Sequence, residues 1–270
     1  MRLISVPRDL KSKMMAARAD SHHVRVATYN IHKCRGLDGR VRPERIVEVL
    51  RELNADVIAL QEVLSLPGNP YGDDHVRFIA EELGFHYCFG ENRKHVGQIY
   101  GDALVSRFPL THVCNYDIST PGREPRGCLR ADVALPGGPL LHLFNIHMGT
   151  SFLERQQQVR RLMSSEILNR PNLRGARIVL GDFNEWTSGT TTRVLSNHFA
   201  SPNLQAHPNR MGTYPGLLPF LHLDQIYFDP KLSLCRSTVH KSWRALVASD
   251  HLPLVVELSL AATSEIPDPR

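Results

Sequence analysis

The order of hydrophobic and polar positions predicts a chain of short strands with a few helices between them. Residues 24–32, VRVATYNIH, are dominated by β-branched and aromatic side chains and predict a strand. Residues 56–63, DVIALQEV, predict a second strand, which is too apolar to be half exposed and is therefore expected to be buried on both faces. Between the two, Pro43 begins a helical pattern whose apolar residues recur along one stripe.

The rest of the chain continues with more strands than helices. One helix is predicted at about 74–83, where Gly84 ends it, and a longer one at about 152–169. The apolar run 178–180 predicts another strand. Further strands are predicted at 102–106, 110–118, 127–135, 139–147, 222–228, 233–239 and 253–259.

Many strands with a few interposed helices indicate an α+β fold. We expect two mostly antiparallel sheets packed face to face, with helices on their outer faces. No linker of convincing length divides the chain, so a single domain is predicted over 23–260. A basic, flexible leader, 1–22, precedes it, and a tail, 261–270, follows it.

Composition places the chain among ordinary globular proteins. Of its 270 residues, 42% are hydrophobic and 22% are charged, and no apolar run approaches the roughly 18 residues needed to span a bilayer. The five cysteines are scattered without a CxxC pair, which argues against a disulfide framework or a zinc site and favours a reducing, cytoplasmic location. The net charge of +5 favours an anionic partner. The leader could also form a short basic helix that contacts anionic lipid, as an alternative to a solvated segment.

Polar side chains interrupt the apolar strands at their ends. Asp182 and Asn184 follow the run 178–180 with Phe183 between them. Strand alternation therefore predicts that the two polar groups face a common space while Phe183 enters the core. An Asx-turn or a helix cap is the alternative explanation for this pair.

The same feature recurs at other predicted strand ends. The residues concerned are Asn30, His32, Glu62, Asn145, His147, Asp224, Asp250 and His251. Taken singly, most have an ordinary explanation, such as an Asn in a turn or a His satisfied in the core. Asp224 differs, because a lone carboxylate in an apolar strand is costly without a partner. Together, these residues predict one shared site.

The chain resembles the endonuclease/exonuclease/phosphatase superfamily in seven segments, which are TYNIH, QEV, GDALVSR, NIHMG, GDFN, LDQIYF and SDH. That group contains deoxyribonuclease I, exonuclease III-type abasic-site endonucleases, neutral sphingomyelinases and inositol polyphosphate 5-phosphatases. The resemblance spans about residues 24–259. It implies a four-layer αββα sandwich, with the active site where strand ends of both sheets converge.

The resemblance also implies a metal site. Asn30 and Glu62 match metal-binding positions, with Glu62 as the principal magnesium ligand. Asp250 would lie beside this metal or at a second metal position. Magnesium, or manganese as an alternative, suits such hard oxygen ligands and needs few protein carboxylates.

Catalytic roles follow from the same resemblance. Asp182 matches the residue that orients or deprotonates the attacking water, and Asn184 matches a neighbour that contacts phosphoryl oxygens. His251 matches the histidine that faces the scissile phosphate, held and charged by Asp224. His147 matches a second histidine, which contacts the phosphate or assists the leaving group.

Two further positions are expected near the substrate phosphate. Asp102 stands where phosphatase-like members often have Asn, and Arg126 begins a stretch, RGCL, similar to one in bacterial sphingomyelinases. Basic residues could also line a groove for a phosphate backbone, or simply form a solvated face. They are Lys33, Arg35, Arg40, Arg42, Arg93 and Lys94.

The leading hypothesis is a magnesium-dependent phosphodiesterase that acts on a phosphate ester, and a nuclease that cleaves DNA is one option. A hydrolase of phospholipid or sphingolipid headgroups, or of inositol phosphates, is the alternative. A catalytically silent binding module on the same fold is a third hypothesis, which the full set of expected polar residues disfavours. We expect a monomer.

Overall fold

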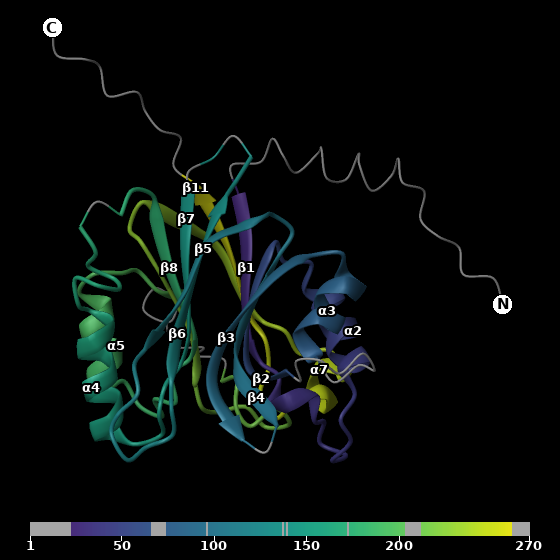
Figure 1. The fold of residues 1–270 in the computed structure, drawn as a ribbon. Helices are drawn as coiled ribbons and strands as arrows, with labels where there is room; N and C mark the ends of the chain where they lie inside the picture. Colours follow the sequence, from purple (N-terminus) through teal and green to yellow (C-terminus); the bar gives the residue numbers. More distant parts are fainter. Residues whose placement is uncertain are drawn as a thin grey trace, which may run out of the picture.

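The computed structural model describes residues 23–65, 74–95, 97–136, 138, 140–171, 173–202 and 212–260. Within these ranges, eleven strands form two sheets that face each other, and helices cover the outer faces (Figure 1). The predicted fold class, a four-layer sandwich of two mixed but mostly antiparallel sheets, is confirmed. The predicted leader, 1–22, and tail, 261–270, lie outside the described residues.

The first sheet has six strands in the order β10-β11-β1-β2-β4-β3. Its neighbours are antiparallel except β1 and β2, which are parallel. The strands are β1 (His23–Asn30), β2 (Val57–Ser65), β3 (His86–His95), β4 (Gln98–Ser106), β10 (Leu232–Val239) and β11 (Leu254–Leu260).

The second sheet has five strands in the order β5-β6-β7-β8-β9. Here β7 and β8 are the parallel pair, and the other neighbours are antiparallel. The strands are β5 (Leu110–Asp117), β6 (Gly127–Ala134), β7 (Leu140–His147), β8 (Ala176–Asp182) and β9 (Asp224–Phe228).

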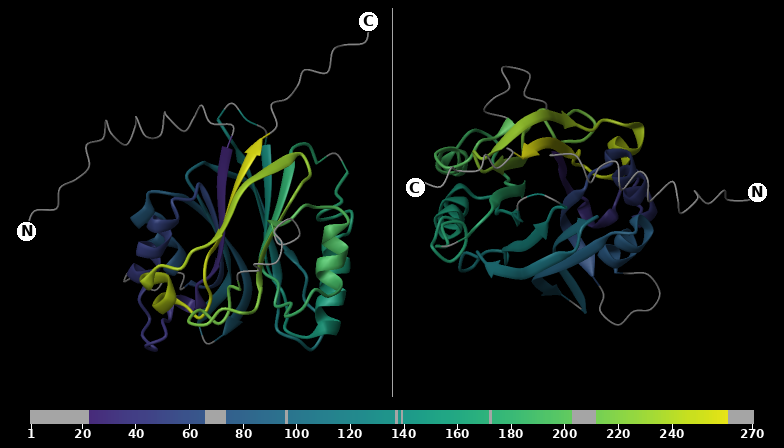
Figure 2. Two further views of the ribbon diagram at one scale, coloured as in Figure 1. Left: turned by 180° about the vertical axis from the view of Figure 1, so that it is seen from behind. Right: turned by 90° about the horizontal axis from the view of Figure 1, so that it is seen from above.

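Helices lie on the two outer sides of the sheet pair, as the opposite views in Figures 1 and 2 show. The six-stranded sheet is covered by α2 (Pro43–Leu53), α3 (His75–Leu83) and α7 (Trp243–Ala248). The five-stranded sheet is covered by α4 (Phe152–Leu162) and α5 (Thr190–Ser196). A short 3-10 helix, η1 (His32–Cys34), follows β1.

Alternation along β7 decides which side chains enter the space between the sheets. Leu141 and Leu143 belong to the large cluster that includes residues of the facing sheet. Phe144 and Ile146 belong instead to the cluster shared with α4 and α5. Because side chains alternate along a strand, His147 lies on the same inner face as Leu141 and Leu143. Side chains alternate along β8 in the same way, so Asp182 also faces the space between the two sheets.

Several elements differ from the sequence prediction. Strand β3 is missing from it, because HYCFGENRKH is polar; such a composition suits an edge strand, and β3 ends the sheet. The helix predicted at 152–169 ends at Leu162, and turns follow in which Asn169 donates to the Met163 carbonyl. The short helices α5 and α7 were not predicted, since neither is long enough to show helical periodicity.

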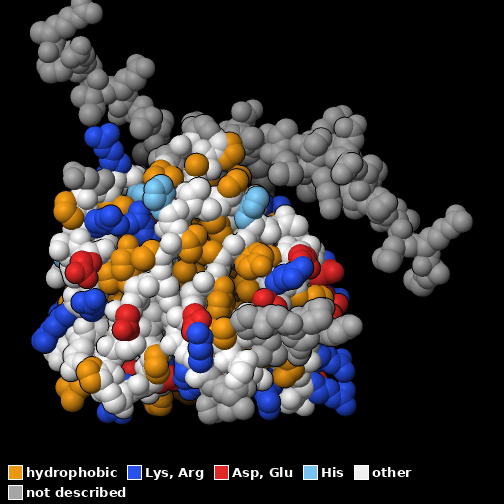
Figure 3. Space-filling view, in the orientation of Figure 1, with side chains coloured by type: hydrophobic (Ala, Val, Ile, Leu, Met, Phe, Trp, Pro, Cys, Tyr) orange, Lys and Arg blue, Asp and Glu red, His pale blue; other side chains and the backbone are white. Residues whose placement is uncertain are grey.

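Three further observations concern helix length, surface charge and the cysteines. No helix among the described residues is long and apolar enough to cross a membrane. On the face shown in Figure 3, Lys and Arg side chains are interspersed with Asp and Glu around hydrophobic ones, and they do not form one basic stripe. All five cysteines are free thiols.

Candidate active site

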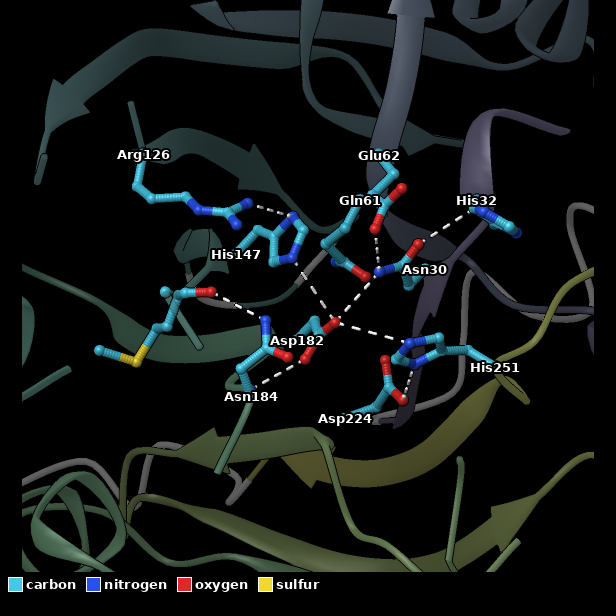
Figure 4. A network of polar contacts seen from close by, with 12 residues as sticks. Asn30, His32, Gln61, Glu62, Arg126, His147, Asp182, Asn184, Asp224 and His251 are labelled. Carbon is cyan, nitrogen blue, oxygen red and sulfur yellow. Dashed lines mark hydrogen bonds and ion pairs between the residues drawn. The ribbon is translucent and has the colours of Figure 1, made fainter. Parts of the chain in front are cut away.

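Polar side chains from both sheets converge on a cavity of about 350 Å³ at one end of the sandwich. β1, β7 and β8 end here and β9 begins here. Eight of the ten predicted site residues line the cavity. They are Glu62, Asp102, Arg126, His147, Asp182, Asn184, Asp250 and His251. The other two, Asn30 and Asp224, lie behind this wall and contact Asp182 and His251 (Figure 4).

Asp182 is the centre of the polar network. It is 1% exposed, and its Oδ2 accepts a hydrogen bond from Asn30 Nδ2 at 3.0 Å. The Nε2 atoms of His147 and His251 each lie 3.7 Å from the same oxygen. The other oxygen, Oδ1, accepts the backbone N–H of Asn184 at 2.9 Å. This carboxylate is therefore fixed in direction while two imidazoles face it (Figure 4).

Asn184 reaches the cavity by a turn and not by strand alternation. β8 ends at Asp182, and Asn184 has a φ of 49°, in the left-handed region that Asn tolerates. Its side-chain Nδ2 donates to the Met148 carbonyl at 2.9 Å. The Asx-turn considered from the sequence is thus present, and the residue still lines the cavity. Phe183 is buried as predicted.

Glu62 is placed by an irregularity in β2. The pairing of β2 with β4 shifts register between Leu60 and Val63, and Glu62 has a φ of 53°. Such bulges bend a strand and change the direction of a side chain. The strand continues past Glu62, so the prediction that β2 ends there was wrong. The bulge, and not a strand end, brings this carboxylate to the cavity.

The Glu62 carboxylate is held by nitrogen atoms on both of its oxygens. Asn30 Nδ2 donates to Oε1 at 3.3 Å, and Lys33 Nζ lies 3.2 Å from Oε2. Burial alone would raise the pKa of Glu62. Positive charge on His147 at low pH, the Lys33 ammonium and the Asn30 bond outweigh burial and lower this pKa to about 2. Glu62 is consequently an anion throughout the physiological range.

A buried amide pair supports the bulge from the opposite sheet. Gln61 Nε2 donates to Asn145 Oδ1 at 2.7 Å. Asn145 Nδ2 donates to the carbonyls of Leu60 at 2.9 Å and Ala103 at 2.8 Å. Asn145 and Gln61 are fully buried. The sequence pattern placed Asn145 among the strand-end residues but assigned it no role; the structure makes it the cross-sheet support of the site.

His251 and Asp224 form a close buried pair. His251 Nδ1 lies 2.8 Å from Asp224 Oδ2, and the Tyr214 ring packs on the imidazole with ring centroids 4.9 Å apart. Burial opposes a charge on His251. The carboxylates of Asp224 and Asp182 outweigh burial and raise the pKa of His251 to about 10. The ring is therefore an imidazolium at neutral pH and directs Nε2–H toward Asp182.

His147, in contrast to His251, is neutral. Arg126 Nη1 lies 3.0 Å from His147 Nδ1, and a guanidinium can only donate. The neutral ring therefore accepts at Nδ1 and carries its proton on Nε2, which faces Asp182. Burial and the neighbouring Arg126 charge lower the pKa of His147 to about 4. One charged and one neutral imidazole thus direct N–H groups to the same region.

The charges that line the cavity fit a divalent cation. Five carboxylates face it, against three Lys or Arg side chains and the His251 imidazolium. They are Glu62, Asp102, Glu124, Asp182 and Asp250, and Lys33, Arg93 and Arg126. The cavity therefore has no net positive charge to offer an anionic phosphate, and a bound cation would supply it.

The donor set also fits magnesium. Among the described residues, no three His, Cys, Asp or Glu side chains cluster as a complete metal site. Magnesium needs no such cluster, because it retains water and takes one or two carboxylates with substrate oxygens. Asn30 turns its amide nitrogen to Glu62 and Asp182, while its oxygen accepts the His32 N–H at 3.0 Å. As a ligand, Asn30 would use the second lone pair of that oxygen.

The remaining predicted residues divide between the cavity and other surfaces. Asp102 is buried in the cavity wall, where Asn92 Nδ2 donates to it at 2.8 Å and burial raises its pKa to about 7. Of the basic residues considered for a groove, Lys33 and Arg93 line the cavity, while the other four are absent from its lining. Glu124 lines the cavity as well and was not predicted. It lies in the loop between β5 and β6.

Comparison with known proteins identifies the family. The model of the Endonuclease/Exonuclease/phosphatase family matches residues 27–251. The chain belongs to this family. Curated relatives include the "Uncharacterized protein YbhP" of Escherichia coli K12, which is 31% identical over 254 residues that cover 87% of this chain and 96% of YbhP. The family resemblance predicted from the sequence is confirmed.

Solved structures of other bacterial proteins share the fold. An endonuclease/exonuclease/phosphatase from Beutenbergia cavernae has 23% identity and a TM-score of 0.69, covering 88% of this chain and 72% of that chain. A mannosyl-6-phosphatase from Bacteroides thetaiotaomicron has 19% identity and a TM-score of 0.70, covering 87% of this chain and 99% of that chain. Membership of this family suggests a phosphoesterase.

Proposed function

We propose that the protein hydrolyses phosphate diesters with magnesium, or with manganese as an alternative ion. The observation that carries this proposal is the position of Asp182 between an imidazolium and a neutral imidazole, with the Glu62 anion beside it. Hydrolysis of a phosphate diester needs a positioned water, neutralisation of the charge on the phosphoryl oxygens and help for the leaving oxygen. These side chains supply each of these requirements.

Asp182 is proposed to orient the attacking water and to accept its proton. The water oxygen bonds to phosphorus, the bond from phosphorus to the leaving oxygen breaks, and that oxygen takes the Nε2 proton of the His251 imidazolium. The proton that Asp182 accepted from water then returns to His251, whose Nε2 lies 3.7 Å from Asp182 Oδ2. Asn30 and the Asn184 N–H keep the carboxylate in one direction during this step. The Nε2–H groups of His251 and His147 are free to donate to phosphoryl oxygens, His251 with a full positive charge.

Glu62 is proposed to hold the metal, with Asp250, which also lines the cavity, near it or near a second ion. When bound, the metal supplies Lewis-acid charge that neutralises the phosphate. Asp250 is partly exposed and lies 3.5 Å from His32 Nδ1, so it stays accessible to a cation. Asn184 contributes its amide near the phosphoryl oxygens, and Arg126, which already donates to His147, is positioned to approach the substrate phosphate.

The substrate class is tested by a panel assay. Purified protein with magnesium is incubated with DNA, RNA, phospholipids, inositol phosphates and bis(p-nitrophenyl) phosphate, and the Asp182→Asn variant serves as the matched control. We expect magnesium-dependent cleavage of the generic diester and of nucleic acid in the wild type, and a loss of both in the variant. Cleavage of monoesters alone would refute the diesterase proposal. Preference for phospholipids over nucleic acid would select the headgroup hydrolase instead.

A further inference from the structure

A chain of contacts, one hydrogen bond followed by two ion pairs, extends outward from the reaction site along one wall of the cavity. Arg126 contacts His147 with Nη1 at 3.0 Å and Glu124 Oε2 with Nη2 at 2.9 Å. The other oxygen of Glu124 contacts Arg93 Nη1 at 3.0 Å. The Glu124 carboxylate is thus held between the Arg93 and Arg126 guanidinium groups at the cavity wall. Arg126 also contacts the His147 ring, which faces Asp182.

Both guanidinium groups have donors left over. Their Nε atoms are buried and have no hydrogen-bond partner among the described residues. The Arg93 guanidinium also lies 5.0 Å from the centre of the Tyr100 ring, a cation–π contact that fixes its plane. Two arginines that are held in place, and that each keep a donor without a partner, can bind an anion with more oxygens than a carboxylate.

The Glu124 side chain can be displaced from between Arg93 and Arg126 at little cost. Its side chain is 46% exposed, whereas the Arg126 side chain is 11% exposed. Exposed ion pairs contribute little to stability, so removing Glu124 from between the arginines costs little. A phosphate group offers more acceptor oxygens and more charge than this carboxylate, and Arg recognises phosphate through paired hydrogen bonds.

We propose that Arg93 and Arg126 form a subsite for a second phosphate group of the substrate, and that Glu124 occupies this subsite until substrate displaces it. The inference rests on the proposed function and names its substrate class: a phosphate diester with another phosphate beside the scissile one. The second phosphate can belong to a polynucleotide backbone or to the terminal monoester of a small molecule. Both present the same oxygen anion to the two arginines.

The test compares pairs of substrates that differ only in the second phosphate. The first pair is the p-nitrophenyl ester of thymidine 5′-phosphate with and without a 3′-phosphate. The second pair is a short oligothymidylate and the same oligomer with neutral methylphosphonate links beside one normal phosphate. We expect kcat/KM to be about tenfold higher for the phosphate-bearing member, since one charge-assisted hydrogen bond accounts for that factor.

Three variants make the assignment specific. Arg93→Gln should reduce the preference for the second phosphate about tenfold, mainly through KM. Glu124→Gln keeps the size of the side chain but removes its charge, and should increase this preference about threefold. Lys94→Gln is the matched control, because Lys94 is the adjacent cation, pairs with Glu91 at 3.2 Å and is absent from the cavity lining. It should leave the preference unchanged.

The outcomes separate the two proposals. If no diester is cleaved with magnesium, the proposed function fails. If diesters are cleaved but neither pair shows a preference, or Lys94→Gln reduces it as much as Arg93→Gln does, the subsite alone is refuted. A higher kcat/KM for the phosphate-bearing member of the thymidine pair only would assign the subsite to a terminal phosphate. A higher kcat/KM for the phosphate-bearing member of the oligomer pair would assign it to a polynucleotide backbone. Thermal unfolding of each variant confirms that it is folded.

Discussion

Replacing Asp224 by Asn should convert a constantly charged His251 into one that titrates near neutral pH. The substitution keeps the shape of the side chain but removes the charge that lies 2.8 Å from the ring. The pKa of His251 is raised from 6.5 to about 10, which corresponds to roughly 5 kcal/mol in favour of the imidazolium. Asp182, at 3.7 Å, provides part of this effect and remains in the variant.

The magnitude follows from the closer of the two carboxylates. An adjacent opposite charge shifts a pKa by about 1–3 units, so we expect the pKa of His251 to fall by about 2–3 units in Asp224→Asn. At pH 6 most of the variant rings are still charged, and at pH 9 most are neutral. Turnover relative to the wild type should therefore fall at least about tenfold between pH 6 and pH 9, in addition to any loss that is independent of pH.

Two measurements check this expectation. NMR titration of the histidine ring gives the pKa of His251 in the metal-free wild type and variant, and kcat between pH 6 and pH 9 gives the consequence. An unchanged ring pKa, or a rate ratio that is constant over this pH range, would show that Asp224 does not keep His251 charged. Stability provides a third measurement. Because the folded-state pKa exceeds the unfolded value, this contribution is complete below about pH 6.5 and is lost as pH rises toward 10. Asp224→Asn should therefore destabilise the fold more at pH 6 than at pH 9.

Three further predictions concern the metal, the buried pair and the cross-sheet support. A chelator should abolish turnover, magnesium should restore it, and Glu62→Gln should raise the magnesium concentration needed, as measured by titration of activity and by calorimetry. His251→Ala should lower the free energy of unfolding by about 3 kcal/mol, since it leaves the buried Asp224 carboxylate without its partner. Asn145→Ala should lower the free energy of unfolding by about 2–4 kcal/mol, because two buried carbonyls lose their donor. Asn197→Ala, at an exposed position, is the control, and urea unfolding measures the stability of both variants.

Each of these predictions has an outcome that contradicts it. Full turnover in excess chelator after exhaustive dialysis would exclude the metal. A His251→Ala variant as stable as the wild type would show that Asp224 has other partners or is protonated. If Asn145→Ala and Asn197→Ala have equal stability, the cross-sheet amide does not support the fold.

Most of the site could be predicted from two physical rules: side chains alternate along a strand, and a buried charge is costly without a partner. In β7 the period of two places His147 on the inner face from the sequence alone. Asp224 was expected to need a partner because it adjoins apolar residues, and the structure places His251 against it. The sheet pair and its outer helices followed from the number and order of apolar runs.

Other features depend on tertiary contacts that leave no local pattern. Glu62 reaches the cavity through a bulge that is supported by Asn145 from the opposite sheet, and nothing in QEV indicates that bulge. Glu124 and Arg93 come from a loop and an edge strand, where polar residues are common for many reasons. Their relation exists only once the two sheets are packed together. Sequence periodicity reports which way a side chain faces, but not which residue of the other sheet it meets.

The most direct test of the account is the magnesium-dependent hydrolysis of bis(p-nitrophenyl) phosphate by the wild type and by Asp182→Asn. We expect turnover by the wild type that requires magnesium or manganese, and a rate at least about a hundredfold lower in the variant. Thermal unfolding of both proteins must remain cooperative, so that the difference reports on chemistry. Equal rates in the two proteins, or no turnover by the wild type with either metal, would contradict the proposal that Asp182 activates water for attack on a phosphate diester.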